Sequence, residues 1–237
     1  MADLVYPPVI AVAKTMFRLL NMRITVEGAE HVPTTGGAVI ACNHVSYLDF
    51  IFCGLGANAS KRLVRFMAKE SIFRHKIGGP LMRGMRHIPV DREAGMASYK
   101  AALENLKAGE VVGVFPEATI SQSFTIKDLK NGAARLAAAT GTPLVPMVLW
   151  GTQRFWTKGH PKNLKQRGVP ITIIAGEPLH PTRKDNADAV TAELRTRMTA
   201  MLDRAQREYR DRPEGVFWQP AHLGGTAPTP ESLLAAD

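Results

Sequence analysis

The 237-residue chain has only two cysteines, Cys42 and Cys53, and their spacing matches neither a zinc site nor a CxxC redox pair. It also lacks an apolar run of membrane-spanning length, because Lys14 and Arg18 interrupt the hydrophobic N-terminal stretch. No basic segment precedes that stretch, as one does in a secretory signal peptide. We therefore expect no metal framework, reduced thiols in a cytosolic setting, and neither a transmembrane helix nor a cleaved leader.

Acidic residues are scarce, since 21 Asp and Glu face 30 Lys and Arg and leave a formal net charge of +9. Such a surplus attracts an anionic partner, which is nucleic acid, an anionic membrane surface or a phosphorylated substrate. Residues 61–86 hold much of it, with Glu70 as their single acid. The cations there are Lys61, Arg62, Arg65, Lys69, Arg74, Lys76, Arg83 and Arg86. This run indicates an anion-binding surface, and a plain solvated face is the simpler alternative.

Residues 1–22 predict an amphipathic helix. Lys14 and Arg18 lie four residues apart on one side of it, opposite a broad apolar face. That face consists of Val9, Ile10, Val12, Ala13, Met16, Phe17, Leu19 and Leu20. A helix of this kind either packs on a protein core or lies in the plane of a membrane interface, and the pattern fits both.

Seven short runs rich in β-branched residues alternate with longer helical patterns. The runs are "RITVEG", "AVIAC", "RFMAKE", "RHIPVD", "VVGVFPE", "LVPMVLW" and "ITIIAGE". Their spacing predicts a single α/β domain over residues 23–210, with a central, mostly parallel mixed sheet flanked by helices. The short gap near residue 90 leaves room for an antiparallel pair, and helices are expected at about 94–107 and 187–210.

Residues 211–237 are rich in Pro, Gly and Ala and show no sustained period, which predicts an extended C-terminal tail. Phe217 and Trp218 are its aromatic residues. Isolated aromatics more often pack than bind, so we expect them to pin the tail to the body of the protein.

His44 and Asp49 are two polar residues inside the apolar stretch "VIACNHVSYLDFIF". The stretch begins as a strand, and "SYLD" has the form of a capping box that would start a helix at Ser46. Within one helix, residues five apart point about 140° away from each other, so the pair meets only if the helix begins between them. Asp49 can then orient the His44 imidazole as a general base. The simpler alternative makes Asp49 a helix-start charge and His44 a donor in the turn.

"NHVSYLDF" resembles the N-H-x-x-x-x-D signature of the glycerolipid acyltransferase family, and three further blocks follow in that family's order. They are "IPVDR" at 88–92, "VFPEATIS" at 114–121 and "LVPMVLWG" at 144–151. Together the blocks cover roughly residues 20–180, and the α/β fold that the family implies agrees with the strand pattern.

The resemblance implies that His44 is the base and that Asp49 orients it. Further residues implied at the substrate site are Lys69, Arg92, Glu117 and Thr119. Arg92 and Lys69 would lie at a phosphate, and Glu117 would help to hold the glycerol portion. His44 would deprotonate an acceptor hydroxyl, which attacks the carbonyl of a fatty acyl thioester without a metal or another cofactor.

The implied donor is acyl-CoA or acyl carrier protein, and the implied acceptor is 1-acylglycerol-3-phosphate or a related anionic glycerophospholipid. Glycerol-3-phosphate, another lysophospholipid or a glycolipid stays open as acceptor, because the third block has Ala118 and Ile120 where the family has glycine and arginine. An aliphatic side chain cannot replace the phosphate donor, although Lys127 and Lys130 can supply charge nearby.

A peripheral protein on the cytoplasmic face of the cell membrane, in contact with the phospholipid surface, is the expected setting. The rival interpretation is a basic module that binds nucleic acid or membrane without catalysis. No basic motif interleaved with aromatic residues is present, so we expect no nucleic-acid partner.

Overall fold

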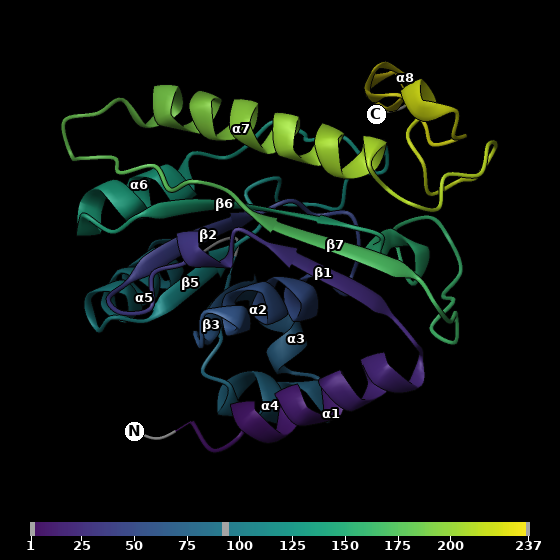
Figure 1. Ribbon diagram of the computed structural model, residues 1–237. Helices are drawn as coiled ribbons and strands as arrows, with labels where there is room; N and C mark the ends of the chain where they lie inside the picture. Colours follow the sequence, from purple (N-terminus) through teal and green to yellow (C-terminus); the bar gives the residue numbers. More distant parts are fainter. Residues whose placement is uncertain (1–2, 92–94, 236–237) are drawn as a thin grey trace.

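The computed structural model describes residues 3–91 and 95–235 and shows a sheet between two layers of helices (Figure 1). Within those residues the sheet has seven strands in the order β1-β7-β6-β2-β5-β3-β4. The strands are β1 (Arg23–Glu27), β2 (Ala38–Cys42), β3 (Val64–Lys69), β4 (Ile88–Val90), β5 (Val111–Val114), β6 (Leu144–Trp150) and β7 (Pro170–Ala175). Each lies on one of the predicted runs, and the α/β fold with a mostly parallel mixed sheet is confirmed.

The antiparallel pair of this sheet is β6 with β7, because every other pairing of the described strands is parallel. Near residue 90, where the sequence left room for such a pair, β4 runs parallel to β3. Two short helices, α3 (Glu70–Phe73) and α4 (Gly78–Gly84), occupy the connection between these strands. They provide the crossover that a parallel pair requires.

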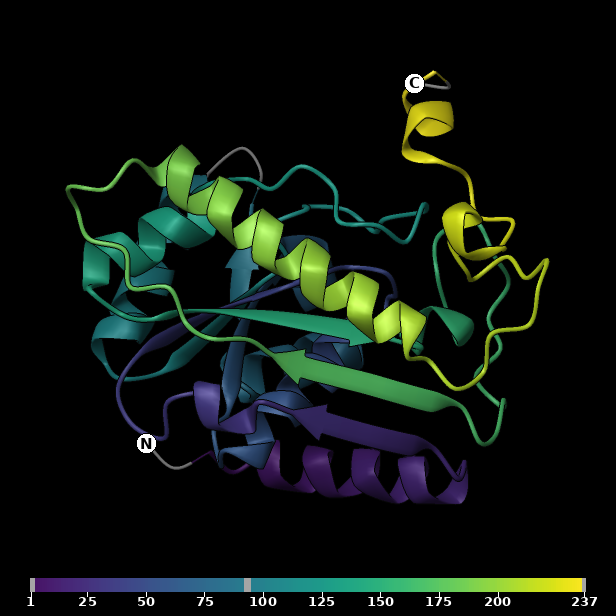
Figure 2. The same ribbon diagram turned by 45° about the horizontal axis from the view of Figure 1, so that its top comes forward.

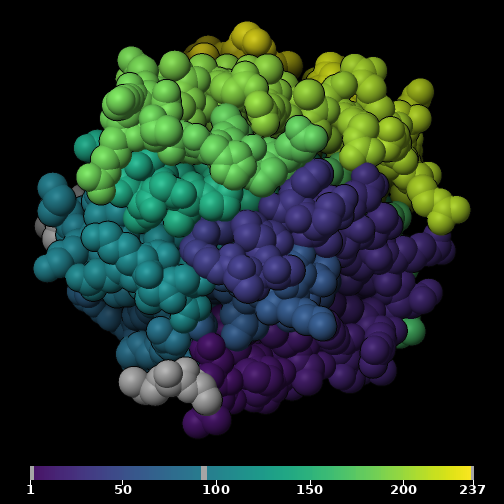
Figure 3. Space-filling model, turned by 60° about the vertical axis from the view of Figure 1, so that its left-hand side comes forward, coloured from purple at the N-terminus to yellow at the C-terminus, as the bar shows by residue number. Residues whose placement is uncertain are grey.

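The helices divide between the two faces of the sheet (Figure 1). In the space-filling view the N-terminal residues (purple) accordingly lie at the bottom of the molecule, and the C-terminal part of the chain (light green and yellow) lies at the top (Figure 3). Beside α3 and α4, one face carries α1 (Tyr6–Leu19) and α2 (Asp49–Ala59). The other face carries α5 (Gly95–Lys107), α6 (Gly132–Thr140) and α7 (Ala187–Arg207). The two longer helices that the sequence predicted are α5 and α7, and α7 ends three residues before the expected residue 210. Asn186 caps α7 by accepting from the backbone N–H groups of Asp188 and Ala189.

The central strand β2 is buried along its whole length, because helices cover it from both sides. α2 approaches the sheet closely at Gly56, where a Cβ atom would lie 2.8 Å from a methyl carbon of Ile173. Cys42 and Cys53 are both free and buried in this region. The close packing leaves α2 little freedom to shift, and α2 begins at the candidate site.

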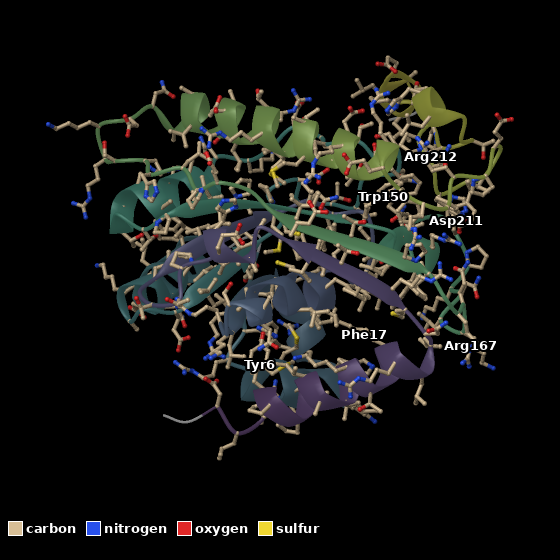
Figure 4. The ribbon with its side chains drawn as sticks, in the orientation of Figure 1. Tyr6, Phe17, Trp150, Arg167, Asp211 and Arg212 are labelled. Atoms are coloured by element: carbon tan, nitrogen blue, oxygen red, sulfur yellow. The ribbon has the colours of Figure 1, made fainter. Side chains whose placement is uncertain are left out.

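One side of α1 packs on the body of the protein. Tyr6 donates a hydrogen bond to the Val64 carbonyl at 2.6 Å, and the Phe17 ring stacks on Phe52 at a centroid distance of 5.0 Å. Both aromatic residues are buried beneath the helix (Figure 4). Other apolar residues of this segment are exposed, namely Leu4, Val12, Met16 and Leu19. The helix thus packs on the core and also presents apolar surface to the outside. No described helix is long and apolar enough to cross a membrane.

Arg65 is a buried cation in the basic run 61–86. Its guanidinium lies 2.8 Å from the Asp3 carboxylate and 3.2 Å from Glu110, and it donates to the Met85 carbonyl at 2.9 Å. Four more arginines of the run hold carbonyls or carboxylates of the protein: Arg62, Arg74, Arg83 and Arg86. Much of this run therefore stabilises the fold, and Arg65 fastens the residues just before α1 to the sheet.

The C-terminal segment is less extended than its composition predicted. Trp218 is buried, with the Arg154 guanidinium 4.4 Å from its ring centroid and its carbonyl accepting from the Gln153 side chain at 3.2 Å. The segment also contains a 3-10 turn, η3 (Ala221–Leu223), and the short helix α8 (Pro230–Leu234). Trp218 thus packs on the body as expected, whereas Phe217 is 36% exposed and stacks on His160 at a centroid distance of 4.1 Å. α8 has no buried residue and stands away from the body (Figure 2).

Replacing Arg65 by methionine should lower the free energy of unfolding by about 3 kcal/mol, because Asp3 and Glu110 then lose the cation that holds them. The matched control is Arg74→Met, which removes an exposed i,i+4 pair and should cost less than about 1 kcal/mol. Urea denaturation of the three proteins measures both values. Equal effects of the two substitutions would show that Arg65 does not stabilise the fold in this way.

Candidate active site

The candidate site begins where β2 ends. Asn43, the next buried residue, continues the sheet with its side chain, which accepts from the Leu149 N–H at 2.7 Å and donates to the Leu149 carbonyl at 3.0 Å. His44 follows and leaves the sheet as a turn. Its Nδ1 atom lies 3.0 Å from Oδ2 of Asp49. The sequence allowed this meeting only if the helix begins after His44, and the helix begins at Asp49.

The capping-box pattern suggested a helix start at Ser46, but the helix begins at Asp49. The Ser46 hydroxyl accepts from the Leu48 N–H at 3.1 Å and donates to the Trp156 carbonyl at 2.7 Å. The Tyr47 N–H donates to the same carbonyl at 3.1 Å. These bonds keep residues 46–48 in a turn, so the regular helix starts three residues later.

Asp49 is fully buried and accepts hydrogen bonds from several sides. Besides His44, the backbone N–H groups of Val45 and Ser46 donate to its Oδ2, both at 2.7 Å. The Thr152 hydroxyl donates to its Oδ1 at 2.6 Å. An acceptor saturated in this way holds a fixed orientation, and the His44 ring bonded to it is fixed as well.

The His44 ring keeps one nitrogen for chemistry. Because Nδ1 faces the Asp49 carboxylate, it carries the proton, and Nε2 is the nitrogen that can accept one. The ring stacks on Phe115 at a centroid distance of 4.4 Å, and 21% of the His44 side chain is exposed. The arrangement suits a general base that a substrate hydroxyl can reach.

Glu117 supports the same turn from the other side. Its Oε1 accepts from the His44 backbone N–H at 2.8 Å and its Oε2 from the Lys127 N–H at 3.1 Å. The Ser121 N–H donates to the His44 carbonyl at 2.7 Å. Burial raises the pKa of the Glu117 carboxyl to about 7. Glu117 thus holds the backbone of the base, and its contact with an acceptor stays a prediction.

The remaining predicted residues are less closely tied to this centre. Lys69 is exposed at the end of β3, and Thr119 is exposed in the turn that follows Glu117. Arg92 lies outside the described residues. Ile120, at the position of the family's arginine, is buried. Its side chain therefore belongs to the core and offers no charge to a ligand.

Ala118, at the position of the family's glycine, has a backbone φ of +59°. Side chains with a Cβ atom adopt this left-handed region at a cost of roughly 1–2 kcal/mol. Ala118 therefore adopts the same backbone conformation that glycine would adopt without strain.

Residues that the sequence did not single out hold residues 44–48, the candidate catalytic turn, from the loop after β6. Thr152 reaches Asp49, the Trp156 carbonyl binds the Ser46–Tyr47 turn, and the Thr157 hydroxyl donates to the Val45 carbonyl at 2.7 Å. A signal for Thr152 was its place directly after the fourth block, "LVPMVLWG". Nothing in the sequence pointed to Trp156 or Thr157, since Trp156 acts through its backbone carbonyl and the Thr157 hydroxyl contacts a backbone carbonyl more than 100 residues away. Among the described residues no cluster of His, Cys, Asp and Glu suited to a metal ion occurs.

The sequence profile of the family described as "Acyltransferase" matches residues 23–150, more than half of the chain, and includes His44, Asp49 and Glu117. The chain belongs to the acyltransferase family. The family blocks read from the sequence are therefore confirmed as marks of membership.

Curated members of the acyltransferase family share substantial identity with the chain. The 1-acyl-sn-glycerol-3-phosphate acyltransferase of Bacillus subtilis (strain 168) is 33% identical over 197 residues, which cover 82% of this chain and 92% of the relative. The chloroplastic enzyme of the same name, LPAT1, from Arabidopsis thaliana is 31% identical over 186 residues, 76% of this chain and 49% of the plant protein.

The crystal structure of the 1-acyl-sn-glycerophosphate (LPA) acyltransferase PlsC from Thermotoga maritima has the same fold. It superposes with a TM-score of 0.73 at 22% identity, and the match covers 86% of this chain and 81% of that one. The acyltransferase fold predicted from the sequence blocks is thus confirmed independently of them.

Glu117 should make the stability of the protein fall as the pH rises. Its folded pKa of about 7 lies above the ordinary 4.5, so its stabilising effect is complete below pH 4.5 and is lost as the pH rises through 7. We expect the wild type to lose on the order of 2 kcal/mol relative to Glu117→Gln between pH 5 and 7.

Urea denaturation of both proteins at several pH values tests this expectation. Burial lowers the pKa of His87 to about 4, so His87 stabilises the protein increasingly as the pH rises from 4 to 6.5. This opposite effect is common to both proteins and cancels in their difference. A difference that is constant across the pH range would contradict the raised pKa of Glu117.

Proposed function

We propose that the protein transfers a fatty acyl group from a thioester to the free hydroxyl of 1-acylglycerol-3-phosphate, with His44 as the general base. The observation that carries the proposal is the 3.0 Å contact between His44 and the fully buried Asp49, which leaves Nε2 of the imidazole open. The acceptor follows the activity for which the Bacillus subtilis and Arabidopsis thaliana relatives are named.

In the proposed reaction Nε2 of His44 takes the proton of the acceptor hydroxyl while the oxygen attacks the thioester carbonyl. Asp49 stabilises the imidazolium that forms. When the tetrahedral intermediate collapses, the C–S bond breaks and the proton passes to the departing thiolate. The products are an ester and a thiol, so the chemistry is complete without a metal or a covalent acyl-enzyme. A positioned base of this kind contributes about 10²- to 10⁴-fold in rate.

For the acceptor phosphate we propose Arg92 and Lys69 as contacts, with Thr119 and Glu117 at the glycerol portion. Residue 120 is a buried isoleucine, so the charge that the family's arginine provides is missing at this position. Lys127 is the substitute that the geometry favours, since its backbone is bonded to Glu117 beside His44. The altered phosphate site also keeps glycerol-3-phosphate, other lysophospholipids and a glycolipid as alternative acceptors.

Both donors considered, acyl-CoA and acyl carrier protein, present the same thioester on a phosphopantetheine arm. The proposed reaction needs only that shared part, so the catalytic residues do not distinguish between them. An assay of acyl transfer therefore has to offer both acyl-CoA and acyl carrier protein as donors.

We further propose that the protein binds peripherally to the phospholipid surface on the cytoplasmic face of the cell membrane. The exposed apolar residues of the N-terminal segment, Val12, Met16 and Leu19, support this setting, and Lys14 and Arg18 are exposed cations on the other side of the same helix. A helix that is apolar on its outer side and carries cations fits the interface of an anionic bilayer. There the acceptor, itself an amphipathic lipid, would be presented to His44.

The purified protein should transfer labelled acyl chains to 1-acylglycerol-3-phosphate, and His44→Ala should reduce the rate at least about 10²-fold while folding is preserved. The assay offers acyl-CoA and acyl carrier protein against a panel of glycerol-3-phosphate, lysophosphatidic acid and other lysolipids. Circular dichroism and urea denaturation serve as the folding control. Near-normal turnover of His44→Ala would refute its role, and transfer to none of the acceptors together with salt-sensitive nucleic-acid binding would favour the non-catalytic rival.

Thr152→Val should lower kcat about tenfold or more without a matching change in the acceptor KM, because Asp49 loses the donor to Oδ1 and holds His44 less firmly. Thr152→Ser keeps the hydroxyl and should retain most of the activity. The pH dependence of kcat distinguishes a loss of positioning from a general structural effect of the substitution. Only a looser contact between Asp49 and His44 should change the pH dependence. Equal activity of both variants would show that the hydroxyl is not needed for positioning.

A further inference from the structure

The loop of residues 151–168, between β6 and β7, carries cations that the proposed reaction does not use. It has five Lys and Arg residues and no Asp or Glu. One of them, Arg154, is engaged inside the protein by Asp211 and Trp218. The other four are exposed, and they are Lys158, Lys162, Lys165 and Arg167. Leu164 lies among them with 48% of its surface exposed, so the outer part of the loop combines positive charge with an apolar side chain.

The far end of this loop meets the end of α1. The Gly168 N–H donates to the Leu20 carbonyl at 2.9 Å, and the Arg23 N–H donates to the Val169 carbonyl at 3.1 Å. Both ribbon views place the loop beyond the last turn of α1, and Arg167 lies there in the view with side chains (Figures 1, 2 and 4). Leu19, at this end of α1, is 67% exposed. The apolar surface of α1 and the outer part of the loop are therefore neighbours.

The near end of the loop is bonded to the catalytic turn. Trp156 and Thr157 hold that turn through the hydrogen bonds already described, and the Trp156 ring lies 4.7 Å from Tyr47. The Lys162 ammonium is 3.9 Å from the centroid of the Trp156 ring. A single loop thus connects the end of α1 with the residues that follow His44.

We propose that residues 158–167 are a second membrane-contact element, which binds the headgroups of an anionic phospholipid surface beside α1. The inference rests on the peripheral membrane binding proposed above and adds the segment that completes it. Exposed cations around an exposed leucine fit a bilayer, because the leucine enters the interface while the cations face the phosphates. Binding of nucleic acid would account for the cations but not for the exposed leucine or for the adjoining apolar side of α1.

The position of the loop gives this contact a role in the reaction. A loop that rests on the headgroups at one end and holds residues 45–47 at the other places the catalytic turn at the level of the lipid surface. The acceptor hydroxyl then has to move only a short way out of the bilayer to reach His44. Each cation at an anionic surface contributes about fivefold to binding, which is roughly 1 kcal/mol expressed as a ratio.

The test compares two triple variants in vesicle binding. The first, Lys158→Ala with Lys165→Ala and Arg167→Ala, leaves Lys162 in place because Lys162 covers Trp156. The matched control, Lys100→Ala with Lys107→Ala and Lys184→Ala, removes three exposed cations from α5 and the connection before α7, at the opposite end of the molecule (Figure 1). The probes are vesicles of phosphatidylcholine with and without phosphatidylglycerol, measured by sedimentation at low salt.

The loop triple should bind the phosphatidylglycerol vesicles about 100-fold more weakly than the wild type, whereas the control should lose only a few-fold. Leu164→Ser should weaken binding to both kinds of vesicle. Acyl transfer in detergent mixed micelles should be unchanged in the loop triple, because none of the altered residues contacts the catalytic turn.

Equal losses in the two triples, or no loss in either, would overturn the inference. An unchanged vesicle affinity with a raised donor KM would also overturn it and would assign the loop to the acyl donor instead. The variant Val12→Ser with Leu19→Ser tests α1 separately, so a binding defect there alone leaves α1 as the membrane element without the loop. Vesicle binding is measured without turnover, so a failure of the proposed acyl transfer is seen independently.

Discussion

The buried carboxylate of Asp49 is the point on which the site depends. It receives hydrogen bonds from a histidine ring, two backbone amides and a threonine hydroxyl. These donors belong to the turn after β2 and to the loop after β6, while Asp49 itself begins α2. A buried carboxylate is stable only when such donors surround it. The requirement to satisfy one charge therefore fixes three segments relative to each other. The same bonds that stabilise the fold leave His44 with a single orientation.

Much of the fold was predictable because its strands are encoded locally. Each run of β-branched residues became a strand, and the paired spacing of His44 and Asp49 required a helix start between them. The contact of Thr152 with Asp49 was not predictable, since 103 residues separate the two in sequence. The burial of Arg65 was hidden for the same reason. Its neutralising partners, Asp3 and Glu110, come from distant parts of the chain, while the sequence around it resembles an ordinary basic surface.

The departures from the family pattern at residues 118 and 120 have different physical consequences. Ala118 keeps the backbone conformation that glycine would favour, so the shape of the turn is preserved at a cost in stability. Ile120 instead turns a position that carries charge in the family into part of the core. The first change concerns only the stability of the turn, whereas the second removes a charge beside His44. The backbone around His44 is thus retained, while the charge that the family pattern has at residue 120 is absent.

The direction of β7 determines at which edge of the sheet the N-terminal helix ends. Because β7 runs opposite to β6, it begins where β6 ends, and β1, which runs parallel to β7, begins at that edge too. The N-terminal helix leads directly into β1, so its last turn arrives at the same edge of the sheet as His44, with β7 and β6 between β1 and β2. Had β7 run with its neighbour, the helix would end at the opposite rim, a full strand length away. One reversed strand thus brings the end of the outer helix α1 and the turn of His44 to the same edge of the sheet.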